Sequence, residues 1–167
     1  MILDEEVFAV ILAISVVASV IGIAMILRPE IPEPFSAIGL LNENCKIGKY
    51  PESAISNTYL NLCISVSNYM GKPMYYKVVF KIGDNTTLPS NESPSPVEPI
   101  MEWYIVLGNK ENQNILVDIL VYADEPLPRT IALIFELWYY DTTRSTWNYT
   151  GLWVHNYIKV YFSPVSG

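Results

Sequence analysis

TYLNLCISVS (58–67) and MYYKVVFKI (74–82) decide the fold class, because side chains in both stretches alternate between two faces with a period of two. In the first stretch, one face carries Leu60, Leu62, Ile64 and Val66, and the other carries Asn61, Cys63, Ser65 and Ser67. In the second stretch, Met74, Tyr76, Val78, Phe80 and Ile82 oppose Tyr75, Lys77, Val79 and Lys81. A strand with one face on a core gives this pattern.

Similar short segments, separated by turn residues, follow along the chain. With the two above they are residues 35–41, 100–107, 114–122, 131–140 and 152–162. No stretch after residue 34 shows a helical period. The sequence therefore predicts an all-β, antiparallel, immunoglobulin-like sandwich of about seven strands over residues 35–167. Gly83–Pro99 holds four prolines, and we expect it to be a mobile surface loop.

The N-terminal residues have a different composition. Val7–Leu27 (VFAVILAISVVASVIGIAMIL) carries no charge over 21 residues, about 32 Å of helix, which is enough to cross a bilayer. The proline-rich RPEIPEP follows (28–34). We expect a transmembrane anchor at 1–28 and a stiff spacer at 29–34. The alternatives are a cleaved signal, for which the run is long and its flank acidic, and a pilin-like filament subunit.

The orientation of the anchor rests on conflicting signals. Arg28 is the flanking cation and favours a cytoplasmic domain. Against it stand three N-glycosylation sequons, which begin at Asn85, Asn91 and Asn148. We expect glycans on Asn148 and Asn85, both in predicted turns, and less readily on Asn91, because Pro94 follows its sequon. The sequence thus favours a single-pass cell-membrane protein with its domain outside the cytoplasm.

Composition and cysteine spacing limit the functions that the protein can have. Charged residues are 16% of the chain against roughly 25% in an average protein. With a net charge of −7 and no basic cluster, nucleic-acid binding is excluded. Cys45 and Cys63 fit a disulfide outside the cytoplasm. His155 is the single histidine, and no motif indicates catalysis, a cofactor or a metal site, so we expect a non-enzyme.

The C-terminal strands carry many aromatic residues. If Leu137, Val154, Ile158 and Val160 face the core, a second set points outward: Trp138, Tyr140, Trp153, Tyr157 and Tyr161. Pairing of these strands through Asp141–Gly151 would gather the set on one face. Exposed aromatic patches mark partner surfaces. Two readings stay open: a partner-binding face, or a structural face, either because the inward and outward sides are reversed or because the domain covers this face itself.

Short motifs along the domain resemble an archaeal membrane-protein family. They are PFSAIGLL (34–41), Tyr50-Pro51, VSNY (66–69) and YYKVVF (75–80). The chain resembles the extracytoplasmic part of the family called domain of unknown function 1616, although it has one membrane helix where longer members have several. The resemblance implies an archaeal envelope protein with a β-sandwich, and no activity.

The sequence therefore predicts a non-enzymatic envelope protein. One helix would hold it in the membrane lipid, and its outer domain would dock onto other surface proteins or a membrane complex. The alternatives are a glycan- or small-ligand-binding module that uses the same aromatic residues, and a filament subunit.

Overall fold

The computed structural model describes residues 4–27 and 33–162. The chain forms two compact units, Met1–Glu33 and Pro34–Gly167.

Helix α1 spans Glu5–Ile26, and Glu5 and Glu6 in its first turn complement the positive end of the helix dipole. The hydroxyls of Ser15 and Ser19 donate to the carbonyls of Ile11 and Ser15 at 2.8 and 2.7 Å, so both are satisfied inside the helix. The helix is long and apolar enough to cross a membrane, a property that an N-terminal signal sequence shares.

The described part of the second unit, residues 34–162, contains eight strands. They are β1 (Phe35–Leu41), β2 (Ser53–Ile55), β3 (Thr58–Tyr69), β4 (Met74–Gly83), β5 (Met101–Leu107), β6 (Glu111–Val121), β7 (Arg129–Asp141) and β8 (Thr146–Tyr161). The seven predicted strands are all present. Three-residue β2 was not predicted, because so short a segment shows no period.

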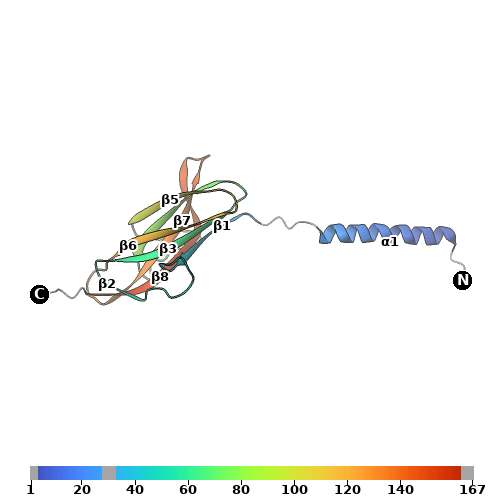
Figure 1. Cartoon of the computed structure of the whole chain (residues 1–167). Coiled ribbons are helices and arrows are strands. Elements are labelled where there is room, and N and C mark those ends of the chain that lie inside the picture. The colour runs from blue at the N-terminus through green and yellow to red at the C-terminus, as the bar shows by residue number, and fades with distance from the viewer. Residues whose placement is uncertain (1–3, 28–32, 163–167) are drawn as a thin grey trace. The chain divides into compact units, whose positions relative to one another are not determined.

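The strands form two sheets that pack as a sandwich (Figure 1). One sheet has the order β1-β3-β6 and the other the order β2-β8-β7-β4-β5. All neighbours are antiparallel except β2 and β8, which pair in parallel. The predicted fold class, a β-sandwich preceded by one apolar helix, is confirmed.

The core lies between the sheets and is made by the apolar faces that the alternation predicts. Leu62, Ile64, Val66, Tyr76, Val78 and Phe80 are fully buried there. Each such side chain stabilises the fold by roughly 1.5–3 kcal/mol. On β7 and β8, Leu137, Ile158 and Val160 also belong to the core, so the phase predicted for these strands is confirmed.

A buried polar network holds the end of the sandwich at which β1 begins, which we call the entry end. Asn68 donates to the carbonyls of Lys72, Leu107 and Gly108 at 2.8–3.0 Å. Its Oδ1 accepts hydrogen bonds from the Met70 amide and the Tyr76 hydroxyl. Tyr76 in turn contacts the Ser36 hydroxyl of β1 at 2.6 Å, and burial raises the pKa of Tyr76. The network joins both sheets at this end.

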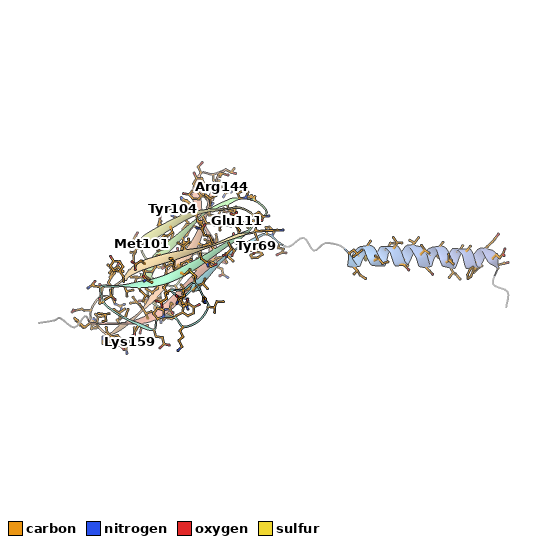
Figure 2. All side chains as sticks on the ribbon, in the orientation of Figure 1. Tyr69, Met101, Tyr104, Glu111, Arg144 and Lys159 are labelled. Atoms are coloured by element: carbon orange, nitrogen blue, oxygen red, sulfur yellow. A yellow bond between two sulfur atoms is a disulfide. The ribbon has the colours of Figure 1, made fainter. Side chains whose placement is uncertain are left out.

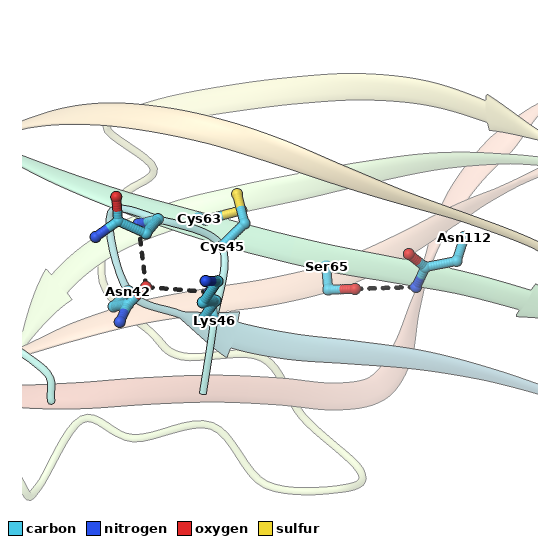
Figure 3. Close-up of a disulfide and its surroundings, with 7 residues drawn as sticks. Asn42, Cys45, Lys46, Cys63, Ser65 and Asn112 are labelled. Atoms are coloured by element: carbon cyan, nitrogen blue, oxygen red, sulfur yellow. Dashed lines mark hydrogen bonds between the residues drawn. A yellow bond between two sulfur atoms is a disulfide. The ribbon is translucent and has the colours of Figure 1, made fainter. Parts of the chain in front are cut away.

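A disulfide joins Cys45 to Cys63, as predicted (Figure 3). Cys45 lies in the loop after β1, and the fully buried Cys63 lies inside β3. The Asn42 carboxamide oxygen accepts hydrogen bonds from the backbone amides of Asn44 and Lys46 at 3.0 Å each. These bonds fix the loop around Cys45. The bridge therefore fastens the far end of β1 to its neighbour strand.

The hairpin of β7 and β8 reaches farther than predicted. The connection is residues 142–145, and the Asp141 carboxylate accepts the Thr143 amide at 2.8 Å as in an Asx turn. Strand β8 begins at Thr146, so Asn148 lies in a strand opposite Tyr139 and not in a turn as the sequence suggested.

Candidate functional site

The outer face of the five-stranded sheet, which points away from the core, is partly covered by the segment between β4 and β5. This strap, residues 84–99, is anchored by several contacts. The Tyr149 hydroxyl donates to the Ser90 carbonyl at 3.0 Å, and the Ser95 hydroxyl donates to the Thr87 carbonyl at 2.6 Å. Pro89 and Ser95 are buried. The strap lies at the surface, as predicted, and it also packs onto the sheet at these points.

Beneath the strap lies a buried ion pair. Lys81 of β4 contacts both carboxylate oxygens of Glu136 of β7 at 3.1 and 3.2 Å, and these side chains are 5% and 0% exposed. The Ser95 amide donates to Glu136 at 2.6 Å, and Lys81 donates to the Ser95 carbonyl at 2.8 Å. The Trp138 indole donates to the other oxygen of Glu136 at 3.1 Å. The pair thus ties the strap to two strands.

Gly151 marks where the strap reaches β8. Its φ is +79°, and a Cβ built there would lie 2.5 Å from the Asn91 carbonyl oxygen. The pairing of β7 and β8 shifts register between Glu136 and Trp138, beside this position. A glycine is required here both for its conformation and for the close approach of the strap.

Beyond the strap, toward the entry end, four rings form what we call the aromatic cluster: Tyr75, Tyr104, Tyr140 and Trp147. Trp147 lies at its centre, with ring centroids 5.0 Å from Tyr75, 5.6 Å from Tyr104 and 5.3 Å from Tyr140. Tyr104 is 53% exposed (Figure 2), and its neighbour Val106 is 66% exposed. The cluster is an aromatic surface formed by four strands, β4, β5, β7 and β8.

Charged groups border this cluster. The Lys77 ammonium lies 5.1 Å from the centroid of the Trp147 ring and 5.6 Å from that of Trp138, and it pairs with Glu102 at 3.0 Å. The Tyr104 hydroxyl donates to the same carboxylate, which lowers the pKa of Glu102 and raises that of Tyr104. The lysine therefore fills the space between the indoles.

The five residues predicted as a single partner face fall into two groups. All of them lie on the outer side of the sheet, as their alternation predicts, but the strap at Gly151 separates them. Tyr140 belongs to the aromatic cluster, and Trp138 packs on Tyr149 with centroids 5.5 Å apart. On the other side lie Trp153, Tyr157 and Tyr161. The domain therefore covers the middle of this face itself, which is one of the two readings left open by the sequence, and the partner-binding reading stays a prediction.

The second group forms a row along β8. The rings of Trp153 and His155 lie 5.1 Å apart, and those of His155 and Tyr157 lie 4.8 Å apart. Burial lowers the pKa of His155. The Lys159 ammonium lies 5.5 Å from the Tyr161 ring.

Three residues of the aromatic cluster were missed by sequence reasoning. Trp147 falls in the predicted hairpin connection, and Tyr75 and Tyr104 come from strands far away in the sequence. The polar run between Asp141 and Thr146 is the signal that could have found Trp147, because a four-residue hairpin loop there places Trp147 opposite Tyr140.

The remaining predicted sites lie elsewhere. Asn85 and Asn91 are exposed in the strap, whereas Asn148 is partly buried and the Thr150 hydroxyl of its sequon donates to the Leu137 carbonyl at 2.7 Å. Within residues 4–27 and 33–162, no three His, Cys, Asp or Glu side chains lie together so that they could hold a metal ion.

No protein-family model matches the sequence, and no characterised protein matches it in sequence. Among solved structures, the chain is similar to a CARDB domain from Pyrococcus furiosus, solved in complex with di-metal ions. The two are 14% identical, with a TM-score of 0.48 over 77% of this chain and 90% of that one.

Two larger proteins match over only about a sixth of their length. They are a β-glucosidase from Listeria innocua (9% identity, TM-score 0.45, 76% of this chain and 16% of that one) and an α-2-macroglobulin from Escherichia coli (14%, 0.44, 79% and 17%). At this level of similarity, the comparisons indicate neither ligand nor partner.

Proposed function

We propose that the protein is a non-enzymatic, single-span envelope protein whose β-sandwich docks onto another surface protein through the aromatic cluster. The observation that carries this proposal is the half-exposed Tyr104 beside Val106 on the Trp147 cluster. Rigid aromatic anchors at the centre of an apolar patch are the usual hot spots of protein interfaces. Polar groups at its border, Lys77 and Glu102, supply the rim.

The proposal places helix α1 in the membrane as an uncleaved anchor and the sandwich outside the cytoplasm. The Cys45–Cys63 disulfide supports this side, because such bonds persist in oxidising compartments. The exposed sequons at Asn85 and Asn91 support it as well. Protease added to intact cells should then remove the domain, and the intact mass of the mature protein should include residues 4–27. A mature start inside α1 would contradict the anchor.

Docking is tested by photo-cross-linking in the native membrane. A photoreactive benzoylphenylalanine in place of Tyr104 should give one discrete protein adduct. The matched control is the same substitution at Tyr59, which is 68% exposed on β3 of the other sheet. In addition, Tyr104→Ala should weaken the native complex by about tenfold or more, as for a hot spot, while Tyr59→Ala leaves it intact.

The adducts formed from positions 104 and 59 also show which results would contradict the proposal. Equal adducts from both, or an adduct from position 59 alone, would refute docking through the cluster. A ladder of adducts of the protein with itself would instead indicate a filament subunit.

A further inference from the structure

A cleft of about 890 Å³ opens at the entry end of the sandwich, next to the aromatic cluster. Its walls come from the start of β1, the turn between β3 and β4, and the projecting hairpin of β7 and β8. In Figure 2, Tyr69 and Arg144 mark this end of the domain and Lys159 marks the opposite end. The volume is within the range of about 300–1,000 Å³ that is typical of small-molecule sites.

The lining of the cleft combines rings with hydroxyls. Phe35 and four tyrosines contribute aromatic faces, and eight of the seventeen lining residues carry a hydroxyl group. Lys72 and Asp141 are the charged residues among them, so the lining is neutral overall. The cleft does not suit a polyanion, because its lining has no excess of positive charge. It does not suit a bare acyl chain either, because the hydroxyl groups would then lose their hydrogen-bond partners.

Some of these hydroxyls already form hydrogen bonds within the domain. Ser36 is bonded to Tyr76, Tyr149 donates to the strap, and Thr150 donates to the Leu137 carbonyl. In contrast, the hydroxyls of Tyr139, Thr142 and Thr143 take part in no hydrogen bond between described residues. Thr143 uses only its backbone amide, in the turn at Asp141. The free groups lie on the hairpin side of the cleft and are available to a ligand.

We propose that this cleft binds a short neutral oligosaccharide. The C–H faces of a pyranose ring pack on aromatic rings such as those of Phe35 and Tyr139, and its hydroxyls exchange hydrogen bonds with Tyr139, Thr142 and Thr143. The ligand class follows from the neutral, hydroxyl-rich and aromatic lining. This activity is distinct from docking, although Tyr75, Val106 and Tyr140 border both sites.

The test uses the full chain in phosphatidylcholine nanodiscs, so that no sugar detergent competes. Three neutral probes, maltohexaose, cellohexaose and chitohexaose, are titrated and followed by saturation-transfer difference NMR. At least one should bind with a Kd of about 1 mM or tighter. Replacing Thr142 and Thr143 with valine keeps their shape and should weaken binding by about fivefold for each hydrogen bond lost. Tyr139→Phe should do the same.

A crossed control separates this proposal from docking. Tyr104 does not line the cleft, so Tyr104→Ala should leave sugar binding unchanged, while the two threonine substitutions should leave the photo-cross-linked complex unchanged. If none of the three sugars binds the unaltered chain at about 10 mM, the proposal is wrong. It is also wrong if a heparin hexasaccharide or lysophosphatidylcholine alone binds, or if the valine and phenylalanine variants bind as well as the unaltered chain.

Discussion

The buried ion pair beneath the strap gives the sharpest stability prediction. Glu136→Gln removes the charge that faces Lys81 and replaces one carboxylate oxygen with an NH₂ group. Both oxygens of Glu136 accept hydrogen bonds, one from Ser95 and the other from Trp138, so the new NH₂ must face a donor. Leaving a buried charge unpaired costs about 3–5 kcal/mol. For a domain of this size, the expected drop in Tm is about 10–20 °C.

Thermal unfolding of the full chain, followed by near-ultraviolet circular dichroism, measures this effect. Glu102→Gln is the matched control, because Glu102 pairs with Lys77 at the surface, where such a pair contributes less than about 1 kcal/mol. The double variant Lys81→Met with Glu136→Gln should lose at least about 1 kcal/mol less than the sum of the single losses. A loss from Glu136→Gln no larger than that from Glu102→Gln would refute the reasoning.

Three further predictions concern Gly151, His155 and the disulfide. Gly151→Ala should destabilise the domain by about 2 kcal/mol more than Gly71→Ala, and it should speed proteolysis of the strap. Both glycines have positive φ, but only a Cβ at Gly151 would collide with the strap. Equal losses of stability in urea unfolding would contradict this prediction. Since burial lowers the pKa of His155, its unfolded form binds the proton more tightly, and stability should fall as the pH drops below about 6.5. His155→Gln should remove this component of the pH dependence of Tm, and an unchanged profile would count against it. Replacing Cys45 and Cys63 with serine should cost about 3 kcal/mol in chemical unfolding, whereas an unchanged midpoint would contradict a stabilising bridge.

Local patterns were enough to predict the strands and their inner faces. The alternation in residues 58–67 and 74–82 identifies the core directly, since each side chain's face follows from its position along the strand. The same rule placed Trp138, Tyr140, Trp153, Tyr157 and Tyr161 on the outer side. Cysteine spacing also predicted the disulfide.

Contacts between distant segments could not be predicted in this way. Lys81 and Glu136 have the alternation of solvent-facing residues, and only the strap makes them a buried pair. The strap in turn is fixed by Ser95, whose hydrogen bonds reach strands 14 and 41 residues away. The aromatic cluster was missed for the same reason, because Tyr75, Tyr104 and Trp147 meet through tertiary pairing.

The Cys45–Cys63 bridge also determines how the domain can respond to a mechanical pull. Any tension that reaches the sandwich from residues before Pro34 enters at the first residue of β1, which pairs with β3 from Phe35 to Leu41. If β1 were stripped away, the segment from Phe35 to Cys45 could extend to at most about 35 Å in total. Beyond that point the load passes through the two sulfurs into the middle of β3, and residues 46–62 carry none of it. The bridge therefore sets a covalent limit to how far the chain up to residue 62 can be drawn out of the domain.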